Sequence, residues 1–338
     1  MAKEDLIIND KNDDGIDRAG FIKCMAWAGT GILWMMNGGV MKSFGMSQMI
    51  DKATGGLKKG LIIPASDFSF VQISDSHIGF NKPANPDVTG TLQSTVAKIN
   101  AMTTAPSFVL HTGDLSHLAQ AEEFDTLDQV LKSVKTEKVF YVPGEHDVLN
   151  GDNKQFLARY GKGTKGDGWY SYDSHGVHFI GLVNVVNTAE GGLGVLGADQ
   201  LKWLEDDLKG LSNSTPIVVF AHIPLWAVYP QWGWGTRDSE QALTYLRRFG
   251  SVTVLNGHIH QTMQKVEGNI TFHTATSTAF PQPQPGTAPA PGPMKVPAEK
   301  LHVLLGLTSV HYLEHDHTLA ITDTPLMEKM EAPAGAMQ

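Results

Sequence analysis

The chain of 338 residues has little cysteine, no run of basic residues and no long apolar stretch. Its one cysteine, Cys24, excludes an internal disulfide framework and a cysteine-based zinc site. Lysine and arginine total 26 against 35 aspartates and glutamates, which gives a formal net charge of −9. We therefore expect no general nucleic-acid binding, because that needs basic residues to neutralise phosphates. Histidine, by contrast, is plentiful at 14 residues, and its placement in the chain is informative.

Residues 1–65 differ in composition from the rest and are interpreted as a signal-like or linker segment. The apolar run Cys24–Met36 would form a helix of about 20 Å, too short for the roughly 30 Å core of a membrane, so we expect no stable transmembrane anchor. Its length is typical of the apolar region of an export signal. The preceding segment 17–23, DRAGFIK, resembles a twin-arginine signal in which Ala19 stands where the second arginine belongs. An exported, periplasmic protein is the favoured interpretation, and a cytoplasmic protein with an N-terminal helix is the alternative.

A proline-rich stretch, residues 281–297, holds seven of the 17 prolines. Proline fixes φ and lacks an N–H, so this stretch is expected to form neither a helix nor a central strand. Too few residues follow it to build an independent core. We therefore expect one domain over residues 66–325, in which the stretch is a surface loop that returns to a last pair of strands. Residues 326–338 are expected to form a C-terminal tail.

Between these ends, short apolar runs alternate with amphipathic segments. Strands are expected at Phe68–Ser74, Phe108–His111, Val139–Val142, His178–Leu182, Ile217–Ala221 and Val252–Leu255. Helices are expected at Val88–Met102, Phe124–Val134, Gly197–Leu208 and Ser239–Phe249. Strands that alternate with helices indicate an α/β fold.

Acidic residues and histidines stand just beyond five successive predicted strands. In order, these segments begin Asp75-Ser76-His77, Gly113-Asp114, Gly144-Glu145-His146-Asp147, His222 and Gly257-His258-Ile259-His260. In open α/β sheets, ligands bind on the loops at the carboxyl ends of the strands. Carboxylate oxygen and imidazole nitrogen are ligands suited to Zn²⁺, Mn²⁺ and iron. Each motif alone is weak, but the ordered set predicts a metal site at the strand ends.

The ordered set resembles the calcineurin-like metallophosphoesterase superfamily, whose motifs run D-x-H, G-D, G-N-H-D/E, H and G-H-x-H. The resemblance extends over residues 68–260 and includes Leu201–Glu205, which looks like the helix that precedes the single-histidine strand. The prolines after Thr276–Phe280 are similar to the tail of the cyclic-nucleotide phosphodiesterase branch. The resemblance implies a four-layer α/β/β/α sandwich that holds two metal ions, iron paired with iron, manganese or zinc.

Carried over motif by motif, the resemblance implies three ligands for a first metal, three for a second and one that is shared. These are Asp75, His77 and His260 for the first, Glu145, His222 and His258 for the second, and Asp114 as the bridge. His146 would lie just outside as the catalytic residue, protonating the leaving oxygen or stabilising the phosphoryl charge. The implied reaction is hydrolysis of a P–O bond by a metal-bound hydroxide.

Two positions depart from the family pattern. Glu145 stands where relatives carry asparagine, so the implied ligand set has three negative charges, which favours a pair such as Fe³⁺ with a divalent ion. The alternative is that Glu145 turns away and the second site is weak or empty. His117 stands where relatives often carry an aspartate that orients the catalytic histidine, and the sequence does not say what holds His146 instead; His111 is one candidate.

Aromatic residues and further histidines lie outside this set. The aromatic residues after His222 either stack on a nucleobase or aryl group of a substrate or pack on one another; they are Trp226, Tyr229, Trp232 and Trp234. The remaining C-terminal histidines are expected to pack or face solvent and not to bind metal; they are His273, His311, His315 and His317.

The sequence therefore predicts a metal-dependent phosphoesterase that acts on small-molecule phosphate esters. A phosphodiester substrate is favoured because of the resemblance to cyclic-nucleotide phosphodiesterases. Two alternatives stay open: a phosphomonoesterase of the acid-phosphatase kind, and a binding protein that keeps the fold without turnover. The full set of aspartates and histidines argues against the second, since a scaffold has no need of it. The sequence leaves the substrate, the metal pair and the oligomeric state open.

Overall fold

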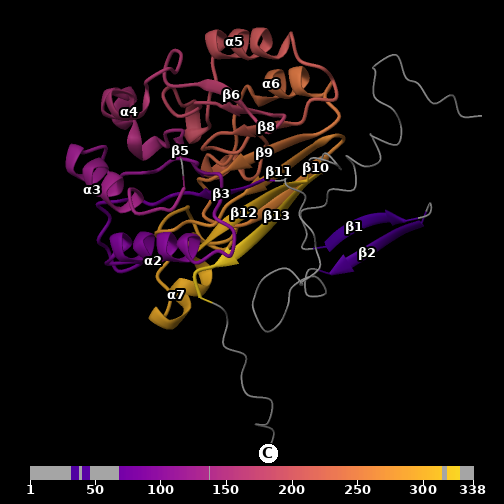
Figure 1. The fold of residues 1–338 in the computed structure, drawn as a ribbon. Coiled ribbons are helices and arrows are strands. Elements are labelled where there is room, and N and C mark those ends of the chain that lie inside the picture. The colour runs from indigo at the N-terminus through magenta and orange to yellow at the C-terminus, as the bar shows by residue number, and fades with distance from the viewer. Residues whose placement is uncertain (1–31, 38–39, 46–67, 137, 314–317, 328–338) are drawn as a thin grey trace, which may run out of the picture.

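The computed structural model describes residues 32–37, 40–45, 68–136, 138–313 and 318–327. Its main body consists of two mixed β-sheets with helices on the outer side of each (Figure 1). The resulting layers, in the order helix, sheet, sheet and helix, confirm the predicted α/β/β/α sandwich.

The first sheet has five strands in the order β13-β12-β3-β4-β5. Their bounds are β3 Phe68–Ile73, β4 Phe108–His111, β5 Lys138–Tyr141, β12 Gly306–Leu313 and β13 Thr318–Pro325. The strands β3, β4 and β5 run parallel, and β12 pairs antiparallel with both β3 and β13. The pair β12–β13 is the final strand pair that the sequence predicts after the proline-rich stretch.

The second sheet has six strands in the order β10-β11-β9-β8-β7-β6. Their bounds are β6 Tyr170–Ser174, β7 Val177–Gly181, β8 Ile217–Phe220, β9 Val252–Asn256, β10 Met263–Glu267 and β11 Ile270–Thr274. The four inner strands β7, β8, β9 and β11 run parallel, while β6 and β10 are antiparallel edge strands. The inner strands are buried throughout, and three of them, β7, β8 and β9, are strands that the sequence predicts.

Aromatic side chains fill the space between the two sheets. Phe70 and Phe108 of the first sheet stack with their ring centroids 5.0 Å apart. Phe179 of the second sheet meets these two rings edge-on, at 5.4 and 5.3 Å. All three side chains are buried. Because such edge-to-face pairs contribute about 0.5–1.5 kcal/mol each beyond the area they bury, this contact holds the two sheets together.

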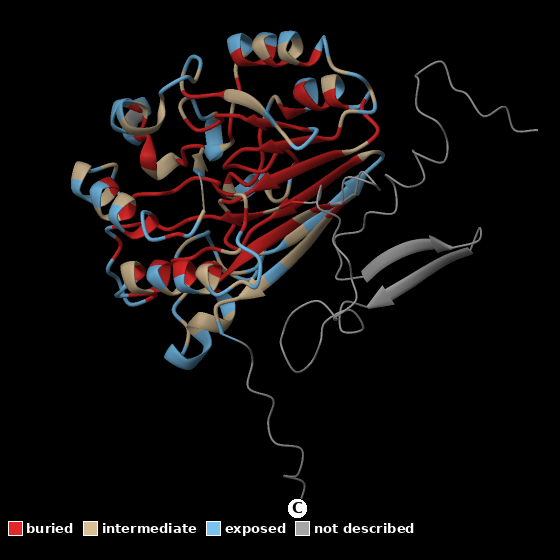
Figure 2. Ribbon diagram, in the orientation of Figure 1, coloured by how far each residue is buried: buried red, intermediate tan, exposed pale blue. Residues whose placement is uncertain are grey.

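Helices cover the outer faces of both sheets. Their bounds are α2 Val88–Asn100, α3 Ala121–Leu131, α4 Lys154–Tyr160, α5 Ala198–Leu208, α6 Ser239–Leu246 and α7 Ala298–Leu304. The helices α2 and α3 pack on the first sheet and α5 and α6 on the second, with buried sides inward and exposed sides outward (Figure 2). In α2 the buried face is formed by Leu92, Val96 and Ile99 at helical spacing, and Asp87 caps the helix by accepting the N–H of Gly90.

Some local features differ from the sequence prediction. The helix α3 begins at Ala121 instead of Phe124, because the Glu123 carboxylate accepts the N–H groups of Leu118 and Gln120 at 2.8 and 3.2 Å.

Residues 281–297 contain neither helix nor strand, as predicted. Within the described ranges, no helix combines the length and the apolar character needed to cross a membrane.

A separate antiparallel hairpin, β1 Ile32–Asn37 and β2 Val40–Gly45, lies within the segment 1–65. The helix predicted over Cys24–Met36 is therefore wrong for its last five residues, and its earlier part lies outside the described residues, as does the segment 17–23. The sequence between the two strands is Gly-Gly, and a glycine pair between apolar runs favours a two-residue hairpin connection over a continuing helix.

Candidate metal centre

The loops after the strands hold their polar residues in an uncommon backbone conformation. Asp75, His77, Asp114, His258 and His260 have positive φ angles of 54°, 42°, 51°, 71° and 53°. This left-handed region costs a residue with a side chain of the order of 1–3 kcal/mol, so it persists only where the surrounding structure enforces it. Here the buried sheets on either side provide that enforcement.

Backbone hydrogen bonds tie these loops to one another. The N–H of Asp75 donates to the Gly113 carbonyl at 3.0 Å, and the N–H of His77 donates to the Asp114 carbonyl at 2.9 Å. Across the two sheets, the N–H of His258 donates to the Asp75 carboxylate at 3.1 Å. The loops from β3, β4 and β9 therefore form one unit.

Glycines are required where the loops approach most closely. A Cβ added at Gly257 would lie 2.0 Å from Ser74 Oγ and 2.7 Å from Asp75 Oδ2. A Cβ at Gly113, whose φ is +96°, would lie 2.4 Å from His222 Nδ1. Both distances are far below van der Waals contact, so the two glycines allow the carboxylate and imidazole groups to converge.

A first group of ligand-type atoms consists of Asp75, His77 and His260, all buried. Asp75 Oδ1 lies 3.2 Å from His260 Nε2, and the Nε2 atoms of His77 and His260 lie 3.3 Å apart. These are the three residues that the resemblance assigns to the first metal.

A second group consists of Glu145, His222 and His258. Glu145 Oε2 lies 2.8 Å from His222 Nε2, and Glu145 Oε1 lies 2.9 Å from His258 Nδ1. Glu145 stands in a single 3₁₀ turn, Glu145–Asp147, and its carboxylate faces the two histidines instead of turning away. The nitrogen that His258 presents to Glu145 is Nδ1.

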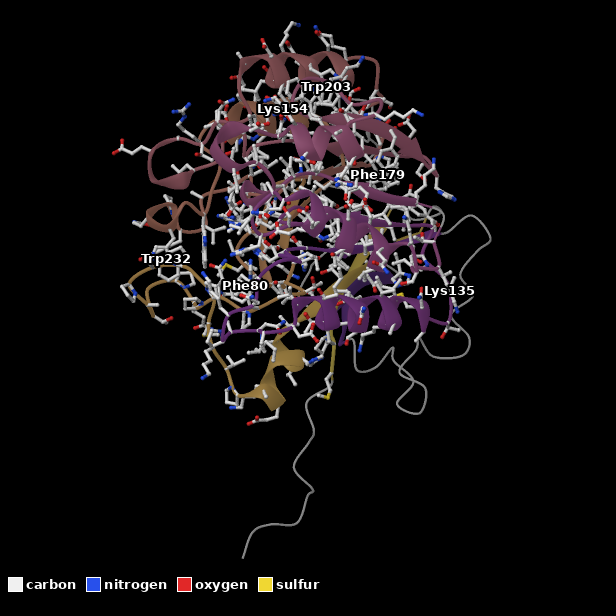
Figure 3. All side chains as sticks on the ribbon, turned by 90° about the vertical axis from the view of Figure 1, so that its left-hand side faces the viewer. Phe80, Lys135, Lys154, Phe179, Trp203 and Trp232 are labelled. Carbon is white, nitrogen blue, oxygen red and sulfur yellow. The ribbon has the colours of Figure 1, made fainter. Side chains whose placement is uncertain are left out.

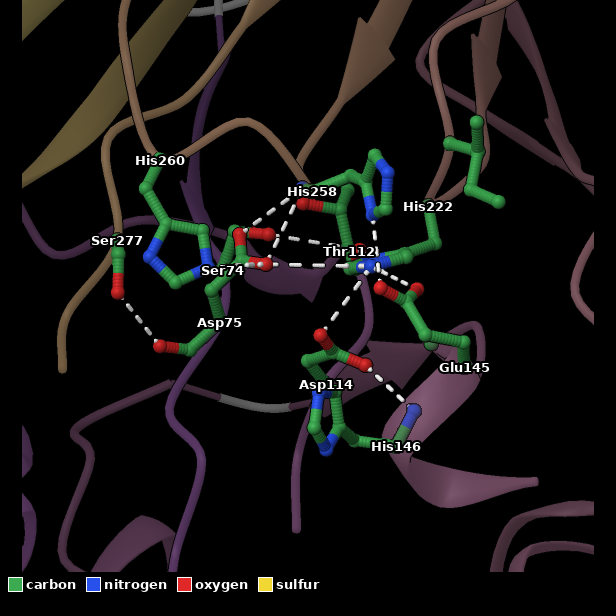
Figure 4. A network of polar contacts seen from close by, with 12 residues as sticks. Ser74, Asp75, Thr112, Asp114, Glu145, His146, His222, His258, His260 and Ser277 are labelled. Carbon is green, nitrogen blue, oxygen red and sulfur yellow. Dashed lines mark hydrogen bonds and ion pairs between the residues drawn. The ribbon is translucent and has the colours of Figure 1, made fainter. Parts of the chain in front are cut away.

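Asp114 lies between the two groups. Its Oδ2 atom is 3.4 Å from His77 Nε2 on one side and 3.4 Å from His222 Nε2 on the other. Figure 4 shows this convergence, with Asp114 and Glu145 reaching toward His222. All seven residues that the sequence proposes as ligands thus meet in one place.

The proton positions on the histidines show why this donor set fits cations. The Nδ1–H of His222 donates to the Thr112 carbonyl at 2.7 Å, and that of His260 donates to the Phe280 carbonyl at 2.5 Å. A carbonyl can only accept, so Nε2 of each ring is the nitrogen that faces carboxylate oxygens. On a neutral ring this nitrogen presents a lone pair to oxygens that are also acceptors, so either a proton on Nε2 or a bound cation is needed to offset their charge. His222 Nε2 and Glu145 Oε2 are buried and have no hydrogen-bond partner in the described structure. Buried acceptors that face one another are stabilised by a cation between them.

The charges of the second group also favour a bound cation. Burial alone would lower the pKa of His222, but the carboxylates of Asp114 and Glu145 raise it well above its ordinary value. Burial would raise the pKa of Glu145, but His258 and His222 hold it well below its usual range. Glu145 is therefore an anion, and the cluster attracts positive charge.

His146 lies beside this cluster. Its backbone N–H donates to Asp114 Oδ1 at 2.9 Å, and its ring Nδ1–H donates to the carbonyl of His117 at 2.7 Å. These bonds fix the ring and leave Nε2 free to exchange a proton. The structure thus shows what holds His146: the His117 carbonyl, and not His111. The ring of His111 is buried, and its Nε2 atom lies 2.8 Å from Ser76 Oγ. Burial lowers the pKa of His111 to about 3.

Asp147 is a residue whose role the sequence does not reveal. It is fully buried and accepts the N–H groups of Leu115, Ser116 and Gly144 at 3.0, 2.8 and 2.9 Å, and the Ser116 hydroxyl at 2.7 Å. Burial, together with the charge of Asp114, raises its pKa to about 6. Asp147 joins the loop that carries Asp114 to the loop that carries Glu145. Its place at the end of Gly144-Glu145-His146-Asp147 is the only signal for it in the sequence.

The aromatic loop after His222 is a packed structure. Trp226 is buried against Phe272 at a centroid distance of 5.1 Å, and Trp234 is buried with Trp232 edge-on at 5.1 Å. Trp232 itself is half-buried and lies at the margin of the molecule in Figure 3, whereas Phe80 lies further inward. The two buried tryptophans thus belong to the core and are not open to a substrate.

The other histidines lie apart from the centre. His273 bonds the Asp323 carboxylate at 3.0 Å and so links β11 to β13 across the two sheets. His311 is half-buried on β12, where burial lowers its pKa. His315 and His317 lie outside the described residues.

Residues 68–262 match the model of the calcineurin-like phosphoesterase family, which is more than half of the chain. The chain therefore belongs to this family of metallophosphoesterases. It is accordingly a metal-dependent hydrolase that acts on phosphoric ester bonds.

Two relatives carry names of phosphodiesterases. The chain is 26% identical over 218 residues to a 3′,5′-cyclic-nucleotide phosphodiesterase of Nostoc sp. strain PCC 7120, a match that covers 63% of this chain and 79% of the relative. It is 25% identical over 170 residues to a protein of Arcobacter nitrofigilis named "probable glycerophosphodiester phosphodiesterase", covering 46% of this chain and 57% of that one.

Solved structures share the fold. A dimetal phosphatase from Danio rerio superposes with a TM-score of 0.59 at 16% identity, covering 77% of this chain and 97% of that one. The purple acid phosphatase PPD1 of yellow lupin superposes with a TM-score of 0.56 at 13% identity, covering 77% of this chain and 52% of that one. At these identities the likeness concerns the fold alone.

Proposed function

We propose that this protein hydrolyses small-molecule phosphodiesters at a centre of two metal ions. The observation that carries the proposal is the position of Asp114, whose Oδ2 lies 3.4 Å from a ligand-type nitrogen of each flanking group. One carboxylate shared between two three-residue groups is the arrangement that a pair of cations requires. Two cations bound there would activate a water and offset the negative charge of the phosphoryl oxygens.

The protein's own residues would hold the ions and manage the protons. Asp75, His77 and His260 are proposed as ligands of the first ion, and Glu145, His222 and His258 as ligands of the second. The bonds from Thr112 and Phe280 fix two of these histidines with Nε2 inward, so no reorientation is needed when an ion binds.

His146 is proposed as the general acid. Its Nδ1–H is held by the His117 carbonyl at 2.7 Å, so a proton on Nε2 is the one available to a departing alkoxide. Burial lowers the pKa of His146, but the nearby carboxylates of Asp114 and Glu145 outweigh burial and raise it above its ordinary value, which favours the protonated ring. A protonated ring would also stabilise the charge that develops on the phosphoryl group.

The choice of a diester rests on the relatives. Both the Nostoc and the Arcobacter proteins are named as phosphodiesterases, whereas the phosphatases share only the fold at identities of 16% and 13%. Phosphomonoester hydrolysis is therefore the second candidate. A binding protein without turnover is disfavoured, because His146 is held beside the proposed ligands by two hydrogen bonds that leave Nε2 available for proton transfer.

The test compares turnover of bis(p-nitrophenyl) phosphate with that of p-nitrophenyl phosphate, on protein reconstituted with iron or manganese. We expect faster hydrolysis of the diester and loss of both activities in Asp114→Asn, which removes the shared charge. Faster hydrolysis of the monoester would replace the diester proposal with a phosphatase. Activity that survives in Asp114→Asn would refute the shared-carboxylate centre.

A further inference from the structure

His117 contacts both His146 and His77, and its position is the second one at which this chain departs from the family pattern. Its carbonyl accepts the Nδ1–H of His146 at 2.7 Å. Its ring stacks on the ring of His146 with centroids 4.8 Å apart and an interplanar angle of 15°. The edge of Phe80, 5.2 Å away at 90°, packs on the same ring. The side chain of His117 is thus held in one orientation.

The same ring reaches the nitrogen of His77 that does not face the centre. His77 Nε2 lies 3.3 Å from His260 Nε2 and 3.4 Å from Asp114 Oδ2, inside the first group. If Nε2 keeps its lone pair for an ion, the ring proton of His77 must be on Nδ1. The Nδ1 atom of His117 lies 3.4 Å from it.

A histidine that binds a metal through one nitrogen commonly donates the proton on its other nitrogen to a fixed acceptor. That bond sets which nitrogen is free and how the ring is turned, and its removal typically weakens metal binding by about 10–100-fold. His260 and His222 have such an acceptor in the carbonyls of Phe280 and Thr112. For His77, the acceptor that the described structure offers is the ring of His117.

We propose that His117 is a positioning residue for two members of the centre at once. Its imidazole Nδ1 accepts the Nδ1–H of His77 and so directs Nε2 of that ring to the first ion. Its backbone carbonyl accepts the Nδ1–H of His146 and so directs Nε2 of that ring, the proposed general acid, to the substrate. This deepens the proposed function and rests on it for the role of His146, whereas the contact with His77 concerns ion binding alone.

One other interpretation of the same atoms is a third cation site. The ligand-type nitrogens of His77, His117 and His146 lie within 4.8 Å of one another. A cation there would need the Nδ1 lone pair of His77, and the proton that sits on Nδ1 when Nε2 faces the first ion excludes it. The number of ions bound therefore separates the two interpretations.

Two substitutions separate the role of the His117 side chain from that of its backbone, and a third at another position is their control. His117→Phe keeps an aromatic ring to stack on His146 and keeps the carbonyl, but it offers no acceptor to His77. His117→Asn restores an acceptor oxygen close to the position of Nδ1. His175→Phe is the matched control, because His175 is an exposed histidine that stacks on Phe68 at 4.3 Å, away from the centre.

The measurement is Mn²⁺ binding to the metal-free full-length protein by calorimetry, with unfolding temperatures recorded for each variant. We expect two ions on the wild type, and in His117→Phe a loss of about 10–100-fold in affinity at one of them. His117→Asn should stay within a few-fold of the wild type, and His175→Phe should be unchanged. Turnover in His117→Phe should fall while the unfolding temperature of the metal-free form is retained.

Two results would overturn the proposal: wild-type affinities in His117→Phe, or a third ion on the wild type that His117→Phe lacks. The calorimetric titration uses no substrate, so it separates this inference from the proposed function, which the turnover measurement addresses. A protein that binds two Mn²⁺ ions with the expected dependence on His117 but cleaves no phosphate ester would refute the function and support the positioning role.

Discussion

At the scale of single residues, the feature that sets this centre apart is its charge. Asp75, Asp114 and Glu145 bring three carboxylates into a space where relatives with asparagine at the third position would have two. Both oxygens of Glu145 face the centre, at 2.8 and 2.9 Å from nitrogens of two histidines, so the extra anion lies within the centre. A more negative donor set binds a more highly charged pair of ions more tightly, because it offsets more positive charge.

We therefore expect Glu145→Asn to change which metals the protein carries. Protein produced in medium with iron, manganese and zinc should contain less iron as Glu145→Asn than as the wild type, since loss of one negative charge weakens binding of Fe³⁺ most. Metal content by plasma mass spectrometry is the measurement.

The control for this change is Glu190→Gln, which neutralises an exposed glutamate that belongs to neither group of proposed ligands. Equal iron content in the wild type and in Glu145→Asn would show that Glu145 does not select the ion. Wild-type protein that carries only zinc or manganese and is fully active would contradict the hypothesis directly.

The residue types in the sequence predict the proposed ligands of this centre but not the contacts of Asp147 and His117 that surround them. The side chains proposed as ligands follow predicted strands, and chemistry singles out aspartate and histidine as metal-binding types. The contacts of Asp147 with Leu115 and Ser116 and those of His117 with His77 and His146 join residues that are 29 to 40 positions apart in the chain. Only the folded loops bring such partners together, so no local pattern indicates them.

At the scale of elements, a second polar cluster joins two strands to a helix. His178 on β7 contacts Asp173 on β6 through Nδ1 at 2.7 Å and Asp207 on α5 through Nε2 at 2.9 Å. Carboxylates only accept hydrogen bonds, so both ring nitrogens carry protons and the ring is a cation. Burial lowers the pKa of His178, but Asp207 and Asp173 outweigh burial and raise it above its ordinary value.

This contact should make stability depend on pH in a defined direction. A raised folded-state pKa means that the contribution is fully present below the unfolded-state value of about 6.5 and is lost as the pH rises through the folded-state value. We expect the unfolding temperature of the wild type to fall more between pH 6 and pH 8.5 than that of His178→Gln. Thermal unfolding of both proteins across this range is the measurement. Parallel pH profiles would show that His178 is neutral.

The elements themselves were largely predictable, and their ends were not. Buried strands such as β8 and β9 stand out as short apolar runs, and α5 stands out by leucines at helical spacing. The start of α3 depends on the Glu123 cap, and the outer strand β10 is mostly exposed, so apolar periodicity cannot indicate either.

At the scale of the whole molecule, the sequence predicted two facing sheets only through its resemblance to a family. Periodicity predicts strands but not their order, and β12 enters the first sheet beside β3 from more than 200 residues further along the chain. Once the family is named, the order of the motifs fixes which strand ends meet. The physical basis is that parallel strands deliver their carboxyl ends to one edge.

The place of the molecule in the cell is a further prediction at this scale. We propose that the segment 1–65 directs export, because Arg18 and Lys23 precede an apolar run too short to span a membrane. In a Gram-negative host, the full-length chain with a C-terminal tag is expected in the periplasmic fraction, and a chain with Arg18→Gln and Lys23→Gln is expected to stay in the cytoplasm. Fractionation with immunodetection measures this, and retention of the unaltered chain in the cytoplasm would contradict export.

The left-handed backbone at five of the proposed ligand positions bears on how the protein acquires its ions. Hydrogen bonds between the loops hold these conformations, so we expect folding of the protein to shape the centre before an ion binds. An ion can then leave and another can enter without refolding of the loops. The ions that the protein carries would then depend on those available in its surroundings. The same polypeptide purified from two growth media would differ in its ions while keeping one fold.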